Sequence, residues 1–178
     1  MKRHSTALSL LLAVAVGALA IATAGSAHSD RGFAIGAQLQ AAPVGADQLP
    51  PACSPVPTPP AGGTSSGTFT AAGAIADYGT ATACFRISPD GGLAGGMRFV
   101  GLKGTFELAY EGFTAFSGPP GTLESALALG DGRILVTAGS GAYATLKARG
   151  RFDVVANLVR GDITATVVGR TSRSYADD

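Results

Sequence analysis

The sequence predicts an all-β chain that folds as a small antiparallel β-barrel of about eight strands. Three observations support this prediction. Short segments alternate apolar and polar residues with period two, which is typical of half-buried strands. Turn signals rich in Gly, Pro and Asp separate these segments every eight to twelve residues or so, as in barrels and sandwiches. Glycine is abundant, at 26 of 178 residues, and many glycines fall inside predicted strands, where small barrels bend tightly.

The segment 134–154 shows the pattern most clearly. Gly139 and Gly141 form a hinge between two predicted strands, because glycine adopts backbone conformations that β-branched residues cannot. After the hinge, alternate residues fall on two faces. One face is apolar and carries Leu146, Ala148, Gly150 and Phe152. The other face is basic and carries Lys147, Arg149 and Arg151. We expect the first face to be buried in the barrel and the second to be solvated.

The remaining predicted strands lie on both sides of this segment. They cover 68–75, 80–87, 98–102, 105–113, 123–129 and 163–168. Turns are predicted at 77–79, 89–92 and 160–162, and Asp131-Gly132 is the strongest hairpin signal in the chain. The segment 122–129 also fits a two-turn helix, but a strand is favoured because the hairpin signal follows directly.

The N-terminus has the features of a secretory signal peptide. Lys2, Arg3 and His4 precede an uncharged apolar run over 7–24, and small residues follow at 25–27. We expect cleavage after Ala27 and a secreted, extracytoplasmic protein. The alternative is an uncleaved membrane anchor, because the apolar run is close to the length that spans a bilayer.

Between the signal peptide and the first predicted strand, 28–67 is rich in proline and glycine. Proline fixes φ and removes a backbone donor, so this composition disfavours helices and central strands. The predicted organisation is therefore a signal peptide at 1–27, a flexible arm at 28–67 and a β-barrel domain at 68–178. Phe33, Ile35 and Leu39 could add an edge strand, but a loose arm is the favoured prediction.

Two cysteines, Cys53 and Cys84, are present in this exported chain. Pairing is the default expectation in an oxidising compartment. The bridge would close a loop of about thirty residues and contribute roughly 3–4 kcal/mol in the chain-entropy model. We expect it to hold the arm against the first strands of the domain. Two free thiols are the alternative, in a host that forms few disulfides.

The residues from Val136 to Phe152 (VTAGSGAYATLKARGRF) resemble the T-G-G-T-G-x-[FY]…A-x-G core of the allene oxide cyclase-like and dirigent-like β-barrels. Ala138 stands where these families usually have glycine. The resemblance extends at fold level over about residues 68–170. It implies an eight-stranded antiparallel barrel around an apolar cavity, and it carries over no catalytic residue.

The composition argues against most enzyme classes. After the predicted cleavage only His28 remains, so a Ser-His or Cys-His pair has no credible base. Once the cysteines pair, no ligands are left for a usual zinc site, and no cofactor or metal is expected. With 13 Lys and Arg against 12 Asp and Glu, the near-neutral balance gives no argument for nucleic acid or for a membrane surface as partner.

Glu107 and Glu111 lie on one face of a predicted strand, about 13 Å apart, which is too far for the carboxylate pair of a glycoside hydrolase. We expect an outer acidic stripe that pairs across neighbouring strands with the stripe of Lys147, Arg149 and Arg151. The alternative places Glu107, Glu111 or Arg149 in the cavity, where a buried carboxylate with a raised pKa could move protons on an apolar substrate.

The favoured function is that of a non-catalytic secreted protein whose barrel holds a small apolar ligand. The candidate cavity-lining residues are Phe85, Phe99, Phe106, Leu108, Tyr110, Leu146 and Phe152. The first alternative is a cyclase or isomerase of the allene oxide cyclase type. The second is a structural envelope protein that self-associates through edge strands into a homo-oligomer.

Overall fold

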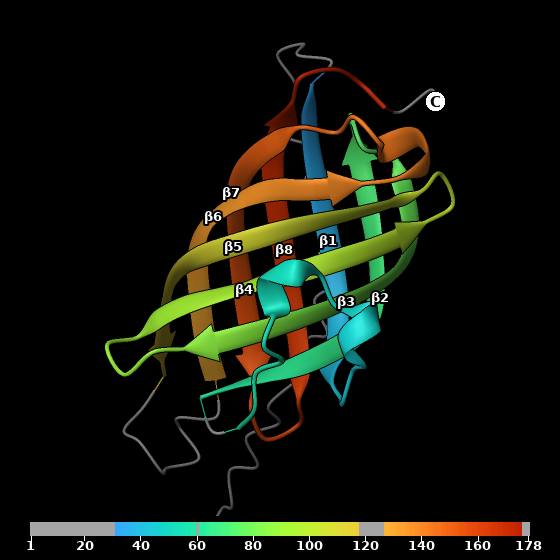
Figure 1. Cartoon of the computed structure of the whole chain (residues 1–178). Helices are drawn as coiled ribbons and strands as arrows, with labels where there is room; N and C mark the ends of the chain where they lie inside the picture. The colour runs from blue at the N-terminus through green and yellow to red at the C-terminus, as the bar shows by residue number, and fades with distance from the viewer. Residues whose placement is uncertain (1–30, 60, 118–126, 176–178) are drawn as a thin grey trace, which may run out of the picture.

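The computed structural model describes residues 31–59, 61–117 and 127–175, which form a closed eight-stranded barrel (Figure 1). Each strand is antiparallel to the next in sequence, and the last pairs with the first. The strands are β1 (Gly32–Ala41), β2 (Gly62–Gly73), β3 (Asp77–Ile87), β4 (Gly92–Gly101), β5 (Thr105–Phe116), β6 (Leu127–Gly139), β7 (Ala148–Asn157) and β8 (Asp162–Thr171). This confirms the predicted fold class. The predicted signal peptide and His28 lie outside the described residues, as does 123–126.

The prediction that the barrel begins near Thr68 and that 28–67 is an arm is wrong. β1 is a full member of the barrel, hydrogen-bonded to β2 on one side and to β8 on the other. Its inward side chains Phe33, Ile35 and Leu39 are buried, so the period-two alternation of this segment does report a strand. β2 begins at Gly62 and includes the last six residues of the expected arm, 62–67, because backbone bonds to two neighbouring strands order residues of weak intrinsic preference.

The remaining arm, from the end of β1 to the start of β2, lies against the outside of the barrel (Figure 1). It carries the short 3-10 helices η1 (Ala46–Gln48) and η2 (Pro51–Cys53). A disulfide joins Cys53 to Cys84 on the outer side of β3, as predicted. Gly96 on β4 leaves room for the arm, because a Cβ there would lie 2.8 Å from Cγ of Pro50.

The turns follow the sequence prediction in part. The hinge is confirmed: β6 ends at Gly139, and Gly141 adopts a φ of 62° at the start of η4 (Gly141–Tyr143). The predicted turns near 89–92 and 160–162 are also present. The segment 77–79 is instead the start of β3, and the turn lies just before it.

The predicted hairpin at Asp131-Gly132 is wrong, because both residues lie inside β6. Gly132 is needed there for close contact rather than for a turn. A Cβ at this position would collide with the carbonyl oxygen of Glu111 on β5 and would lie 2.7 Å from the ring of Phe152.

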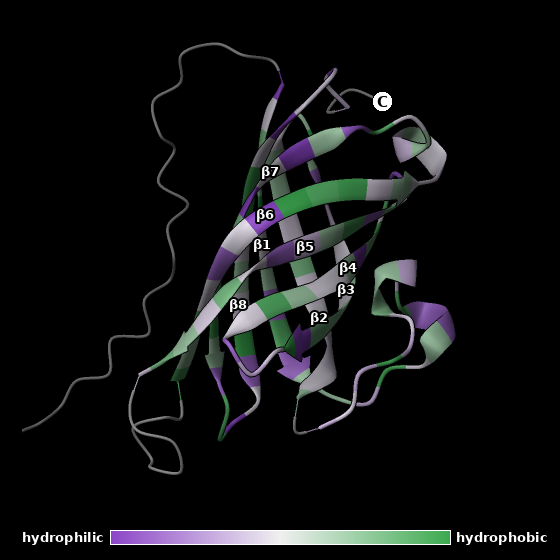
Figure 2. Ribbon diagram, turned by 60° about the vertical axis from the view of Figure 1, so that its left-hand side comes forward, coloured by the Kyte–Doolittle hydropathy of each residue, from purple (hydrophilic) through white to green (hydrophobic). Residues whose placement is uncertain are grey.

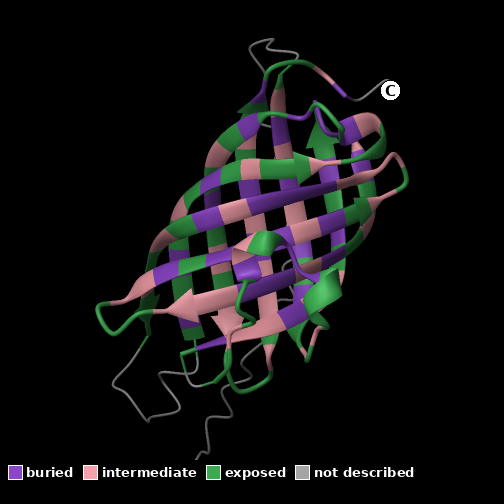
Figure 3. Ribbon diagram, in the orientation of Figure 1, coloured by how far each residue is buried: buried purple, intermediate pink, exposed green. Residues whose placement is uncertain are grey.

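Buried and exposed residues alternate along much of the barrel (Figure 3), and apolar and polar residues alternate along several strands, whereas β6 carries a continuous apolar run over 134–136 (Figure 2). The interior divides into two halves. In the packed half, aromatic rings fill the barrel, with centroid distances of 5.0 Å for Phe69–Phe99, 4.8 Å for Phe99–Phe106 and 5.1 Å for Phe106–Tyr143. These aromatic contacts stabilise the packed half beyond the effect of their buried area. In the open half, smaller side chains leave part of the interior empty.

We predict that a double Cys53→Ser/Cys84→Ser variant loses roughly 3–4 kcal/mol of unfolding free energy, because its unfolded chain regains the entropy of an open loop. Urea denaturation followed by circular dichroism measures this loss. Since the arm lies outside the barrel, the variant should still give the spectrum of a folded β protein. An unfolded variant, or one of unchanged stability, would contradict this account of the disulfide.

Candidate functional site

The open half of the barrel contains an apolar cavity of about 230 Å³. All eight strands contribute to its wall. The cavity lies toward the end of the barrel where β1, β3, β5 and β7 finish, since Ala41, Ile87, Thr114 and Asn157 are among its lining residues. The lining also includes Leu39, Ala83, Phe85, Leu93, Met97, Tyr110, Phe152 and Ile163.

The cavity exists because several inward positions in this half carry small side chains. Ala83 on β3 and Ala128 on β6 are buried and line it, whereas Phe69, Phe99 and Phe106 occupy inward positions in the packed half. An eight-stranded barrel is just wide enough for side chains to fill its interior. Replacing aromatic residues by alanine on the inner face therefore leaves space for a ligand.

Polar side-chain atoms of three wall residues, Tyr110, Thr114 and Asn157, bond to the protein itself. The Tyr110 hydroxyl donates to the carbonyl oxygen of Cys84 at 2.6 Å, and burial raises the pKa of this phenol. The Thr114 hydroxyl donates to the Leu129 carbonyl oxygen at 3.0 Å. Oδ1 of Asn157 accepts from the backbone amides of Val159 and Arg160, at 3.1 and 3.0 Å. The wall therefore favours an apolar ligand over a polar one.

The structure places the candidate lining residues in two groups. Phe85, Tyr110 and Phe152 line the cavity. The others, Phe99, Phe106, Leu108 and Leu146, are buried in the core and are not among the lining residues. Sequence reasoning missed Leu39, because β1 was assigned to the arm. It also missed the alanines, because aromatic residues were taken as the best markers of a cavity.

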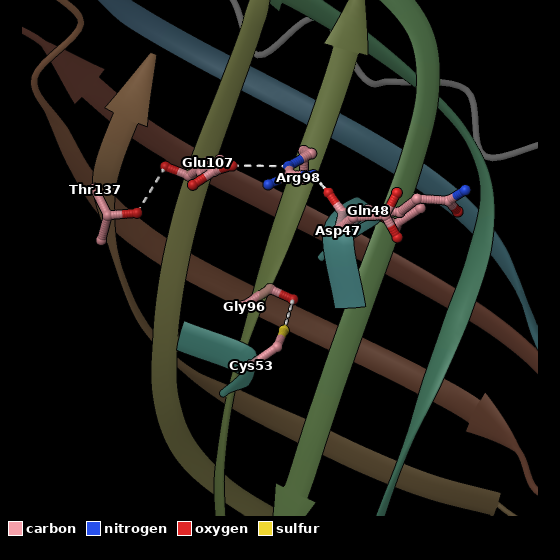
Figure 4. Close-up of polar contacts among 8 residues, drawn as sticks. Asp47, Gln48, Cys53, Gly96, Arg98, Glu107 and Thr137 are labelled. Atoms are coloured by element: carbon pink, nitrogen blue, oxygen red, sulfur yellow. Dashed lines mark hydrogen bonds and ion pairs between the residues drawn. The ribbon is translucent and has the colours of Figure 1, made fainter. Parts of the chain in front are cut away.

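The charged residues considered for catalysis lie outside the cavity. The side chain of Glu107 accepts from Nε of Arg98 at 2.7 Å, and Arg98 also donates to the carbonyl oxygen of Asp47 in the arm (Figure 4). Glu111 and Arg149 are exposed. The alternative that placed these three groups inside the barrel is therefore wrong.

The expected pairing of the acidic and basic stripes is also wrong. β6 lies between β5 and β7, so residues of the two stripes are not cross-strand neighbours. Glu107 pairs with Arg98 on β4 instead, and Glu111 lies opposite Arg133 on β6. The sequence predicted which residues face outward, but it did not predict the strand order around them.

A polar cluster centred on Asp77 lies in the packed half of the barrel. One carboxylate oxygen accepts from the amides of Tyr78 and Leu102, at 2.8 and 3.0 Å. The other accepts from the hydroxyl of Tyr143 at 2.9 Å and from the amide of Lys103 at 3.2 Å. These bonds join the start of β3 to the β4–β5 turn and to η4. Sequence reasoning did not single out Asp77 for such a cluster, and its partner Tyr143 is buried in the core.

Burial of Asp77 favours its neutral form, but the hydrogen bonds from Tyr78, Tyr143, Lys103 and Leu102 outweigh this and lower its pKa. Burial, together with the bond to Asp77, raises the pKa of Tyr143. The pair is thus a charged carboxylate held by neutral donors. All its acceptor atoms are used within the fold, so its role is structural.

We predict that Asp77→Asn lowers the unfolding free energy at pH 7 by about 1–3 kcal/mol, because buried donors lose a charged acceptor. Since the folded-state pKa is lowered, this stabilisation is present above the unfolded value of about 3.9. It is lost as pH falls through the folded value. In urea titrations, the stabilities of both proteins should therefore begin to converge below about pH 4 and meet only below the lowered folded-state pKa of Asp77.

The exposed Asp162 supplies the control, because Asp162→Asn should change stability little at any pH. A difference between the wild type and Asp77→Asn that stayed constant from neutral to strongly acidic pH would show that the ionised carboxylate does not stabilise the fold.

Within the described ranges, no three His, Cys, Asp or Glu residues lie together in a way that could hold a metal ion. The same part of the chain has no helix long and apolar enough to cross a membrane. Comparison of the chain with protein-family models, with curated proteins and with solved structures finds no match.

Proposed function

We propose that this protein acts outside the cytoplasm as a binding protein that holds a small apolar molecule, or the end of an alkyl chain, in the open half of its barrel. The observation that carries the proposal is the apolar cavity, in whose wall the hydroxyls of Tyr110 and Thr114 bond to the protein. The Cys53–Cys84 disulfide supports the compartment, because such bonds are typical of oxidising environments.

The size of the cavity limits the ligand. At about 230 Å³, it is smaller than the pockets of about 300–1,000 Å³ that enclose drug-sized molecules. Each methylene group buried in it contributes about 0.8 kcal/mol. A chain of about eight carbons would thus gain about 6 kcal/mol before the cost of immobilisation. Because about 6 kcal/mol corresponds to a dissociation constant of about 40 μM and immobilisation weakens binding further, we expect dissociation constants between about 40 μM and a few millimolar for simple alkyl ligands.

Binding is better supported than catalysis. Among the residues that the structure describes, those that line the cavity carry no carboxylate, imidazole, amine or guanidinium group, and proton transfer to an apolar substrate needs such a group within hydrogen-bond reach. The Tyr110 hydroxyl is already bonded to Cys84. The described strands also close into a ring, so they present no free edge for the edge-strand pairing that self-association would use.

We predict that Ala83→Leu weakens the binding of 1-octanol at least tenfold, because the added carbons occupy the cavity that Ala83 lines. Isothermal titration calorimetry measures the binding, and the wild type should show a negative heat-capacity change. The substitution fills empty space, so the melting temperature should stay within a few degrees or rise.

Ala94→Leu is the matched control, because Ala94 is exposed on the neighbouring strand β4, and it should bind octanol like the wild type. Ala156→Leu, at the rim of the cavity, provides a second blocking variant if Ala83→Leu folds poorly. Equal affinities for Ala83→Leu, Ala156→Leu and Ala94→Leu, or no binding by the wild type, would refute the proposal.

A further inference from the structure

Four arginines form a basic face on the outside of the barrel, across β6, β7 and β8. They are Arg133, Arg149, Arg151 and Arg170, and all four are exposed. Arg133 lies directly opposite Arg151, and Arg149 lies directly opposite Arg170. Together they surround a shallow hollow whose floor includes Gly150 and Gly169.

The folding of the barrel does not explain this arrangement. Like charges directly opposite each other on adjacent strands destabilise a sheet. In the described part of the chain, none of the four arginines forms an ion pair; the pair that is present joins Arg98 to Glu107.

Acidic residues border the basic face but form no ion pair with its arginines. Glu111 lies opposite Arg133, and Asp131 and Asp153 lie opposite each other in the next cross-strand row. None of these three carboxylates comes within ion-pair distance of the four arginines. The unpaired guanidinium groups therefore remain available to an external anion.

The chemistry of the basic face favours phosphate groups. Guanidinium is a planar fork of donors that binds phosphate or carboxylate through two parallel hydrogen bonds. The outward residues of β6, β7 and β8 include no aromatic ring, so this face offers no platform on which a nucleobase could stack. Exposed aliphatic side chains lie among the arginines instead: Leu135 opposite Arg149, and Val168 opposite Arg151.

We propose that the basic face docks this protein on an anionic lipid surface, with the arginines on headgroup phosphates and Leu135 and Val168 at the interface. Clusters of basic residues bind anionic membranes in this way, with about 1 kcal/mol for each residue near the surface. The near-neutral composition predicted no such partner, because net charge does not show where charges gather. The proposal is independent of the cavity and of its ligand.

The test is co-sedimentation of the mature protein with vesicles of phosphatidylcholine and phosphatidylglycerol at seven to three, compared with pure phosphatidylcholine. We expect binding to the anionic vesicles alone, weakened about fivefold by Arg151→Gln and further by Arg149→Gln/Arg151→Gln. Binding should fall steeply as salt rises, because exposed charges are screened. The melting temperature of Arg151→Gln should be unchanged or raised, because the substitution relieves the repulsion with Arg133.

Arg160→Gln is the matched control, because it removes the same charge from the β7–β8 turn, away from the basic face. It should bind the anionic vesicles like the wild type. Equal weakening by Arg151→Gln and Arg160→Gln, or equal binding to neutral and anionic vesicles, would overturn the proposal. So would release from the vesicles by millimolar inorganic phosphate at constant ionic strength, because that result indicates a site for the free ion.

Discussion

The pairing of β1 with β8 is the constraint on which the rest of the structure depends. It joins the first described strand to the last and closes the ring. Closure gives every strand an inner and an outer face. Alternate residues of each period-two segment therefore point either into the barrel or out of it. It also fixes the interior volume, because eight strands enclose a space that side chains can just fill.

Within that fixed volume, the choice of inward residues divides the barrel. Phenylalanines and Tyr143 fill the packed half, where Asp77 joins the neighbouring turns. Alanines in the other half leave the cavity open. The packed half and the disulfide-bonded arm stabilise the barrel, so the open half can remain partly empty without loss of the fold. A binding site on a rigid scaffold needs this division.

Local pattern predicted the features that depend on local chemistry. The structure confirms the inward and outward faces of 105–113 and of the strand after the hinge. It also confirms the disulfide and the glycine hinge.

β1 was missed because prolines follow it closely and its two partners are distant in sequence. Asp131-Gly132 was mistaken for a turn, because a glycine required by a cross-strand contact looks the same as a turn glycine. Strand order and register determine which alanines line the cavity and which arginines lie opposite each other on adjacent strands. Composition alone predicts neither strand order nor register. The resemblance to allene oxide cyclase-like and dirigent-like barrels stays a prediction.

The central claim is that the open half of the barrel holds apolar space that a ligand can enter. Diffraction from crystals of the mature protein pressurised with xenon tests it most directly, because dry apolar cavities take up xenon. The account predicts xenon between Ala83, Leu93 and Met97, and none among the rings of Phe69, Phe99 and Phe106. A cavity occupied by ordered, hydrogen-bonded water, or closed by its own side chains, would contradict it.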